Sequence, residues 1–185
     1  MANNDNLSEL KIVKNKENGI FLFCGGDTFG GIQRQDILNS LVEKFENCDV
    51  YVYVDKIGNC FLSGIKGITT DIKTTTEYLR ILVSKYKKVI FSGATGIGGY
   101  GAILYGSKLN IPVIITFMPI TIIEKAESLN SKYVDLKTII SAKSKYHIYV
   151  DEINGKHTTN IEEFANVFVN KYENLSVGQL YNSGE

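Results

Sequence analysis

The sequence predicts an α/β fold, a three-layer α/β/α sandwich around a mostly parallel sheet of about six strands. Short runs rich in β-branched and aromatic residues alternate along the chain with stretches of helical periodicity, which is the pattern of consecutive β-α units. Glycine-rich loops follow the first and third of these runs, at residues 25–31 and 93–99. Ligands bind in such sheets beyond the carboxyl ends of the strands, so we expect the site at these loops.

The strands expected in the sheet are short segments of Val, Ile, Leu, Phe and Tyr. They cover residues 19–24, 49–55, 88–92, 112–117, 146–150 and 166–171. The helices expected between them carry apolar residues on one face, as Ile37, Leu38 and Leu41 do in the first helix. They cover residues 33–46, 71–86, 98–109, two short pieces within 120–145, and 159–165. Thr74 and Glu77 have the spacing of a capping box near the start of the second helix.

A single domain over residues 19–175 is expected, with a polar tail at 176–185. Residues 1–18 are expected to form a polar lead-in, either a loose segment or an edge strand. The formal net charge is zero, so no basic face indicates a nucleic-acid partner. The chain has no apolar run of about 18 residues and no signal-peptide core, so neither a membrane span nor export is expected. Its three cysteines form no C-x-x-C pair, which predicts reduced thiols in the cytoplasm and no metal site.

The rest of the chain is organised around residues 88–106, which predict a buried strand, a glycine turn and a buried helix. The glycines of the turn allow a sharp bend and a close approach of the backbone to a ligand. A helix N-terminus at the end of a parallel strand also leaves N–H groups that favour an anion. Together with the loop after the first strand, this predicts a set of ligand-binding residues: Gly26, Asp27, Thr28, Thr95, Gly96, Ile97 and Gly98. An equal alternative is that these glycines serve only the close packing of the helix on the sheet.

The spacing G-x-x-G-x-x-G at residues 93–99 is similar to the dinucleotide fingerprint of extended short-chain dehydrogenases, and Tyr133 and Lys137 form a Tyr-x-x-x-Lys pair. That resemblance implies a nucleotide-dependent oxidoreductase. The context differs, because the fingerprint opens the first β-α-β unit whereas two strand–helix units precede this turn. Met118 and Pro119 also follow the next strand, where an acidic residue would hold a ribose.

A second resemblance extends further along the chain. Residues 53–64, 98–106 (GGYGAILYG) and 117–119 resemble small α/β-hydrolase-like proteins associated with bacterial cell-surface polysaccharide biosynthesis, whose turn has the sequence G-x-S-x-G-G-Y. The GGY-containing helix is the most specific part, and the resemblance covers roughly residues 19–175. It implies the strand order 2-1-3-4-5-6, with the order reversing between the first and third strands.

The chain departs from that family at the catalytic residues. Gly96 stands where the family has its serine nucleophile, and glycine has no side chain that could attack an ester. Asp151 suits the position of the triad acid, but no histidine follows Lys171, where the family's histidine belongs. His157 falls one element too early for that role.

Cysteine is the remaining candidate for a nucleophile. Cys60 lies in the loop over the expected site and Cys24 ends the first strand, and each would need a lowered pKa to act as a thiolate. The leading expectation is a pseudo-hydrolase, a binding or assembly module for a small-molecule or glycan-related ligand, with no cofactor. The alternative is an active enzyme, either a hydrolase or acyltransferase with a cysteine nucleophile or the nucleotide-dependent oxidoreductase.

Overall fold

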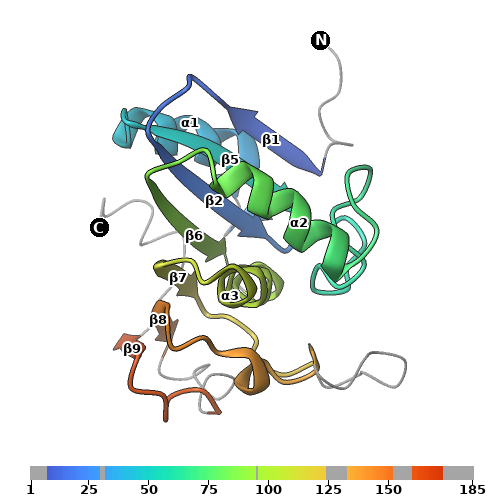
Figure 1. Ribbon diagram of the computed structural model, residues 1–185, viewed down its shortest axis with the longest axis vertical. Coiled ribbons are helices and arrows are strands. Elements are labelled where there is room, and N and C mark those ends of the chain that lie inside the picture. The colour runs from blue at the N-terminus through green and yellow to red at the C-terminus, as the bar shows by residue number, and fades with distance from the viewer. Residues whose placement is uncertain (1–7, 30–31, 95, 124–132, 152–159, 173–185) are drawn as a thin grey trace.

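A computed structural model describes residues 8–29, 32–94, 96–123, 133–151 and 160–172 (Figure 1). A seven-stranded sheet forms the centre of the molecule, with the order β1-β5-β2-β6-β7-β8-β9. Its strands are β1 (Glu9–Ile12), β2 (Asn18–Cys24), β5 (Cys48–Val54), β6 (Lys88–Ala94), β7 (Val113–Phe117), β8 (Lys145–Asp151) and β9 (Val167–Tyr172). A two-stranded pair, β3 (Thr28–Phe29) and β4 (Ile32–Gln33), follows the first glycine loop.

The six strands expected from the sequence are confirmed as the parallel part of this sheet. From β5 to β9 every neighbouring pair is parallel, and β2 lies between β5 and β6. The predicted reversal of strand order between β2 and β6 is therefore confirmed. The seventh strand, β1, pairs antiparallel with β5 at the edge and comes from the segment expected as a lead-in.

In the described part of the chain, three α-helices cover the sheet: α1 (Arg34–Lys44), α2 (Ile72–Val83) and α3 (Ile97–Leu109). Helix α1 packs on one face over an aliphatic cluster that includes Ile20, Val52 and Leu38. Helices α2 and α3 lie on the other face, in front of the sheet in Figure 1, over a larger cluster rich in Phe and Tyr. Because the strands alternate their side chains between these two clusters, both faces of the central strands are buried. The expected three-layer arrangement is confirmed.

The described residues after β7 do not form the helices expected there. Within the described part of residues 120–145, one 3-10 turn forms, η3 (Leu136–Ile139), and residues 160–166 form turns in place of a helix. The reason is that the backbone here bonds to a distant segment: Ile123 N–H donates to the Val134 carbonyl and Leu136 N–H to that of Thr121. These long-range bonds use groups that a helix would have bonded locally.

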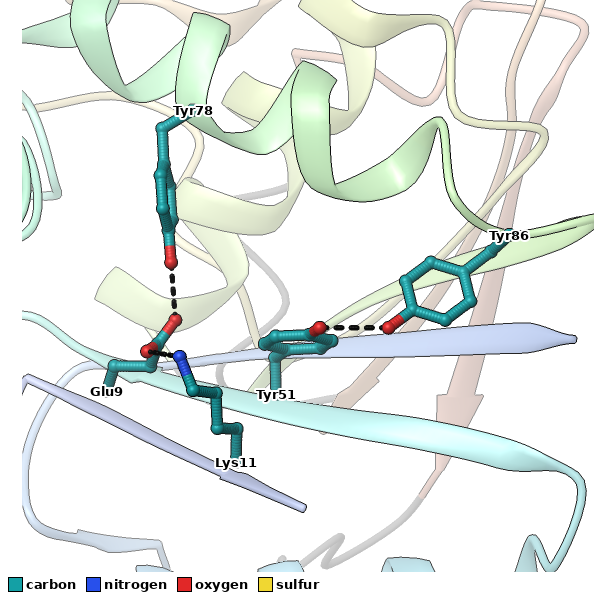
Figure 2. Close-up of polar contacts among 5 residues, drawn as sticks. All are labelled: Glu9, Lys11, Tyr51, Tyr78 and Tyr86. Carbon is teal, nitrogen blue, oxygen red and sulfur yellow. Dashed lines mark hydrogen bonds and ion pairs between the residues drawn. The ribbon is translucent and has the colours of Figure 1, made fainter. Parts of the chain in front are cut away.

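A network of tyrosines and carboxylates ties α2 to the sheet edge formed by β1 and β5 (Figure 2). The Tyr78 hydroxyl donates to Glu9 at 2.6 Å, and the same carboxylate forms an ion pair with Lys11 at 2.7 Å. The hydroxyls of Tyr51 and Tyr86 lie 2.9 Å apart. The strand contributed by the N-terminal segment is thereby bonded both to the sheet and to the helix above it.

Candidate functional site

The turn from β6 into α3 has the geometry expected of a hydrolase nucleophile turn. Gly96 has φ 47° and ψ −108°, a conformation that side chains rarely adopt. Two hydrogen bonds to the segment after β7 stabilise this conformation. Gly96 N–H donates to the Met118 carbonyl at 2.8 Å, and Ile120 N–H donates to the Gly96 carbonyl at 3.2 Å. A Cβ placed at Gly96 would have no atom within 4 Å. The turn therefore holds Gly96 at a positive φ beside open space.

Neighbouring glycines let α3 begin directly against the sheet. A Cβ at Gly93 would lie 2.5 Å from the Gly99 Cα, and one at Gly99 would lie 2.5 Å from the Pro119 Cβ. A Cβ at Gly98 would overlap the Phe23 carbonyl. These three glycines serve close packing, whereas Gly96 serves the backbone conformation of the turn.

A pocket of about 370 Å³ opens beside this turn, at the carboxyl ends of β2 and β6 where the strand order reverses. Residues from the loop after β2 and from the turn after β6 form its walls. They are Cys24, Gly25, Gly26, Thr28, Ala94, Gly96 and Ile97. The pocket thus lies at the switch point at which α/β sheets bind ligands.

The structure brings four of the predicted ligand-binding residues together around this pocket: Gly26, Thr28, Gly96 and Ile97. Two others lie apart from its lining. Gly98 is buried against β2, and Asp27 turns its carboxylate toward two cations. Thr95 lies outside the described residues.

Backbone N–H groups are the donors that the pocket offers. The first-turn N–H groups of α3, beginning at Ile97, have no acceptor within the helix, and the helix dipole makes this end partly positive. In α/β hydrolases the N–H after the nucleophile and one from the loop after an earlier strand form the oxyanion hole. Here Ile97 and the loop at Gly25 and Gly26 stand in those places. The arrangement can hold a carbonyl oxygen or an anion.

Neither candidate cysteine is ionised at neutral pH. Burial raises the pKa of Cys24 to about 12, although the positive charge of Arg34 acts in the opposite direction. Burial and the Asp55 carboxylate raise the pKa of Cys60 to about 11. A cysteine nucleophile needs a thiolate, and both environments favour the neutral thiol. Cys60 also lies outside the pocket lining, in a loop that Asp55 holds by accepting a hydrogen bond from Phe61 N–H.

Among the residues that the structure describes, the other triad candidates do not form a catalytic set at Gly96. Asp151 is buried at the carboxyl end of β8, the position expected for the acid. His147 lies in the middle of β8, where its ring stacks on Phe168 with centroids 5.4 Å apart. It pairs with Ile115 on β7, about 13 Å along β8 from the carboxyl end at Asp151. His157 lies outside the described residues.

Tyr133 and Lys137, the pair required by the oxidoreductase alternative, have separate partners. The Lys108 ammonium donates to the Tyr133 hydroxyl at 3.2 Å, whereas Lys137 forms an ion pair with Glu163 at 2.7 Å. Lys137 lies on the 3-10 turn η3 and Tyr133 precedes it, so the two do not share the face of an α-helix. The geometry gives no support to a tyrosine–lysine catalytic pair.

A cluster of charges behind the pocket was missed by the sequence reasoning. Arg34 at the start of α1 lies 3.0 Å from an Asp27 oxygen, and Lys56 after β5 lies 2.5 Å from the same oxygen. Asp27 and Arg34 lie near each other in the sequence, and Arg34 N–H also donates to the Asp27 carbonyl at 3.2 Å. Lys56 is distant in the sequence and joins them because β5, which it follows, pairs with β2 in the sheet.

No family model matches the sequence, and no curated protein matches it. Solved structures do match its fold. A lipase/esterase from Lactobacillus plantarum superposes with a TM-score of 0.55 at 11% identity, covering 91% of this chain and 87% of the esterase. Esterase B from Lactobacillus rhamnosis gives a TM-score of 0.58 at 10% identity, over 86% of this chain and 65% of its own.

A third similar structure is the glycosylation-associated protein complex Gap123 from Streptococcus agalactiae. It gives a TM-score of 0.53 at 12% identity, covering 96% of this chain and 44% of that one. The match therefore spans less than half of the Streptococcus chain. These similarities define the class: the chain has an α/β-hydrolase-like fold. Among the described residues, no helix is long and apolar enough to span a membrane.

Proposed function

We propose that this protein is a hydrolase-like binding module that holds a small ligand without turning it over. The observation that carries the proposal is Gly96, which keeps the backbone conformation of a nucleophile and opens onto a pocket but supplies no nucleophile. The neutral thiols of Cys24 and Cys60 support the same conclusion. Binding then depends on backbone donors at Ile97 and the loop at Gly26, which need no side-chain chemistry.

A role in glycan metabolism is the finer part of this proposal. Its support is the fold shared with a glycosylation-associated protein complex, together with the sequence resemblance to polysaccharide-associated proteins. In such a setting a hydrolase-like module without a nucleophile would recognise a ligand or a partner and leave the chemistry to another protein.

Amide chemical shifts test the binding directly. Butyramide, a neutral carbonyl compound that the protein cannot hydrolyse, is titrated while the amide signals of Gly26 and Ile97 are followed by NMR. Saturable shifts at these residues are expected. The Gly26→Val variant should weaken or abolish them, because Gly26 lines the pocket and a Cβ there meets no atom within 4 Å, so the larger side chain adds bulk at the lining without disturbing the fold.

The Gly26→Ala variant is the matched control, since its single methyl leaves most of the pocket free. Turnover is measured in parallel with methyl butyrate. Hydrolysis above the buffer rate, or shifts that Gly26→Val leaves intact, would show that the pocket does not bind as proposed.

A further inference from the structure

The wall of the pocket next to Gly26 is backed by a buried positive charge. The Arg34 side chain is only 6% exposed, and its guanidinium lies 3.0 Å from Asp27, whose side chain is half exposed. Lys56, 16% exposed, contacts both oxygens of the same carboxylate at 2.5 and 2.6 Å. Asp27 itself sits between Gly26 and Thr28, two residues of the pocket lining. Arg34 and Lys56 do not line the pocket, but both contact the carboxylate of a residue within the ligand loop.

The positive charge of this cluster reaches the pocket. Arg34 acts on the thiol of Cys24, a residue of the pocket lining, and opposes the effect of burial on its pKa. Arg34 is also the first residue of α1, and the helix dipole disfavours a positive charge at a helix N-terminus. A buried cation in this position needs negative charge nearby. Asp27 supplies one carboxylate, and an anion in the pocket would supply a second.

We propose that the pocket prefers an anionic ligand, a carboxylate or a phosphate group, over a neutral carbonyl compound, and that Asp27 competes with this ligand for Arg34 and Lys56. The inference rests on the proposed function and names the ligand class of the same site. Asp27 then acts as an internal carboxylate that satisfies the cations when the pocket is empty. An arriving anion interacts with the same two cations through the wall formed by Cys24, Gly26 and Thr28.

The test compares butyrate and inorganic phosphate with butyramide at fixed ionic strength, with the Ile97 amide shift as readout. Butyrate and butyramide have nearly the same size and differ in charge. At least one anion should bind about tenfold or more tightly than butyramide. Phosphate binding without butyrate binding would identify the phosphate group as the ligand chemistry, and the reverse result would identify the carboxylate.

Two variants test the charges separately. Asp27→Asn removes the competing carboxylate and should tighten anion binding several-fold, with butyramide unchanged. Lys56→Gln should weaken anion binding several-fold. Glu17→Gln and Lys87→Gln are matched controls, because this exposed ion pair, 2.7 Å apart, joins the ends of β2 and β6 away from the pocket. Glu17→Gln changes the net charge as Asp27→Asn does, and Lys87→Gln changes it as Lys56→Gln does. Both controls should leave the affinity for anions unchanged.

The possible failures are distinguishable. If butyramide binds at Ile97 as tightly as both anions, or if Asp27→Asn weakens anion binding or leaves it unchanged, the preference for anions is wrong while the binding module stands. If neither butyramide nor either anion shifts the Ile97 amide, the proposed function fails as well. Melting curves of each variant show whether a changed affinity comes from a changed fold.

Discussion

Gly96 is the residue on which the account of this protein depends. The hydrolase resemblance aligns it with the serine nucleophile of that family. In the structure Gly96 has a positive φ of 47°, with open space where a side chain would project. Glycine adopts these angles with little strain, whereas a residue with a side chain would be strained there.

Replacing Gly96 with serine tests this conformation. Gly96→Ser should lower the free energy of unfolding by about 1–3 kcal/mol, because a non-glycine residue is strained at these angles. For a chain of this size that is a fall in Tm of about 2–4 °C per kcal/mol. Thermal melting measures it, with Gly26→Ser as control, since that side chain also enters open space but without a positive φ. An unchanged or higher Tm for Gly96→Ser would mean that the turn is not strained.

The same Gly96→Ser variant should not hydrolyse esters. A serine needs a base to accept its proton, and His147 is held in the middle of β8 by stacking on Phe168. A burst of product with acyl transfer to residue 96 would contradict this. It would show that a histidine reaches the turn after all.

At the scale of elements, hydrogen bonds explain where the helices of the structure differ from those expected from the sequence. Helix α2 was expected to carry a capping box of Thr74 and Glu77, but the box lies three residues earlier. The Asp71 carboxylate accepts from Thr74 N–H at 2.8 Å, and the Thr74 hydroxyl accepts from Asp71 N–H. These hydrogen bonds lower the pKa of Asp71. An acidic N-cap is also favoured by the helix dipole, which the spacing rule alone does not weigh.

The tyrosine network at the sheet edge gives a second prediction at this scale. Tyr78→Phe should destabilise the protein by about 1–2 kcal/mol, because it removes a hydrogen bond to the largely buried Glu9 carboxylate. Lys11→Met, which removes the half-exposed partner of the same carboxylate, should cost less. Urea denaturation of both variants checks the order. A larger effect for Lys11→Met would show that the ion pair, and not the tyrosine, holds β1 in place.

The sequence was sufficient for most of the sheet and insufficient for the site. Periodicity identifies the six parallel strands, because the central ones are compact apolar runs buried on both faces and the edge strand β9 alternates apolar and polar residues. It fails after β7, where backbone bonds between residues 121–123 and 134–136 replace helical ones. It also misses the cluster of Asp27, Arg34 and Lys56. Such long-range contacts arise from the order of strands, which periodicity does not encode.

At the scale of the whole molecule, the buried thiols make the free energy of unfolding fall as the pH rises in the alkaline range. Cys24 and Cys60 keep their protons in the folded protein up to pKa values of about 12 and 11, against an ordinary value of 9.0. Above pH 9 the unfolded chain therefore binds fewer protons than the folded one, so stability falls as pH rises. The slope reaches about 1.4 kcal/mol per pH unit for each thiol.

Urea denaturation between pH 8 and pH 10.5 measures this slope. The full stability should be present below about pH 9 and decline above it, and Cys24→Ala should make the decline less steep. Tyrosines whose pKa is raised from 10.0 add to the decline at the upper end of this range in both proteins. A free energy of unfolding that stays constant or rises over this range would mean that the thiols ionise as easily in the folded protein. In that case Cys24 or Cys60 would again be a candidate nucleophile in its thiolate form.

The central claim is that this hydrolase-like protein binds a small ligand without catalysing its hydrolysis. Covalent labelling tests this claim most directly. The purified protein is incubated with p-nitrophenyl butyrate at pH 7.5, and its intact mass is measured over time. Because Gly96 has no nucleophile and the pKa values of both buried thiols are raised, the mass should stay that of the unmodified chain. Stoichiometric addition of one butyryl group, mapped to Cys24, Cys60 or any other residue of the pocket, would contradict the account and identify the protein as an active acyl-transferring enzyme.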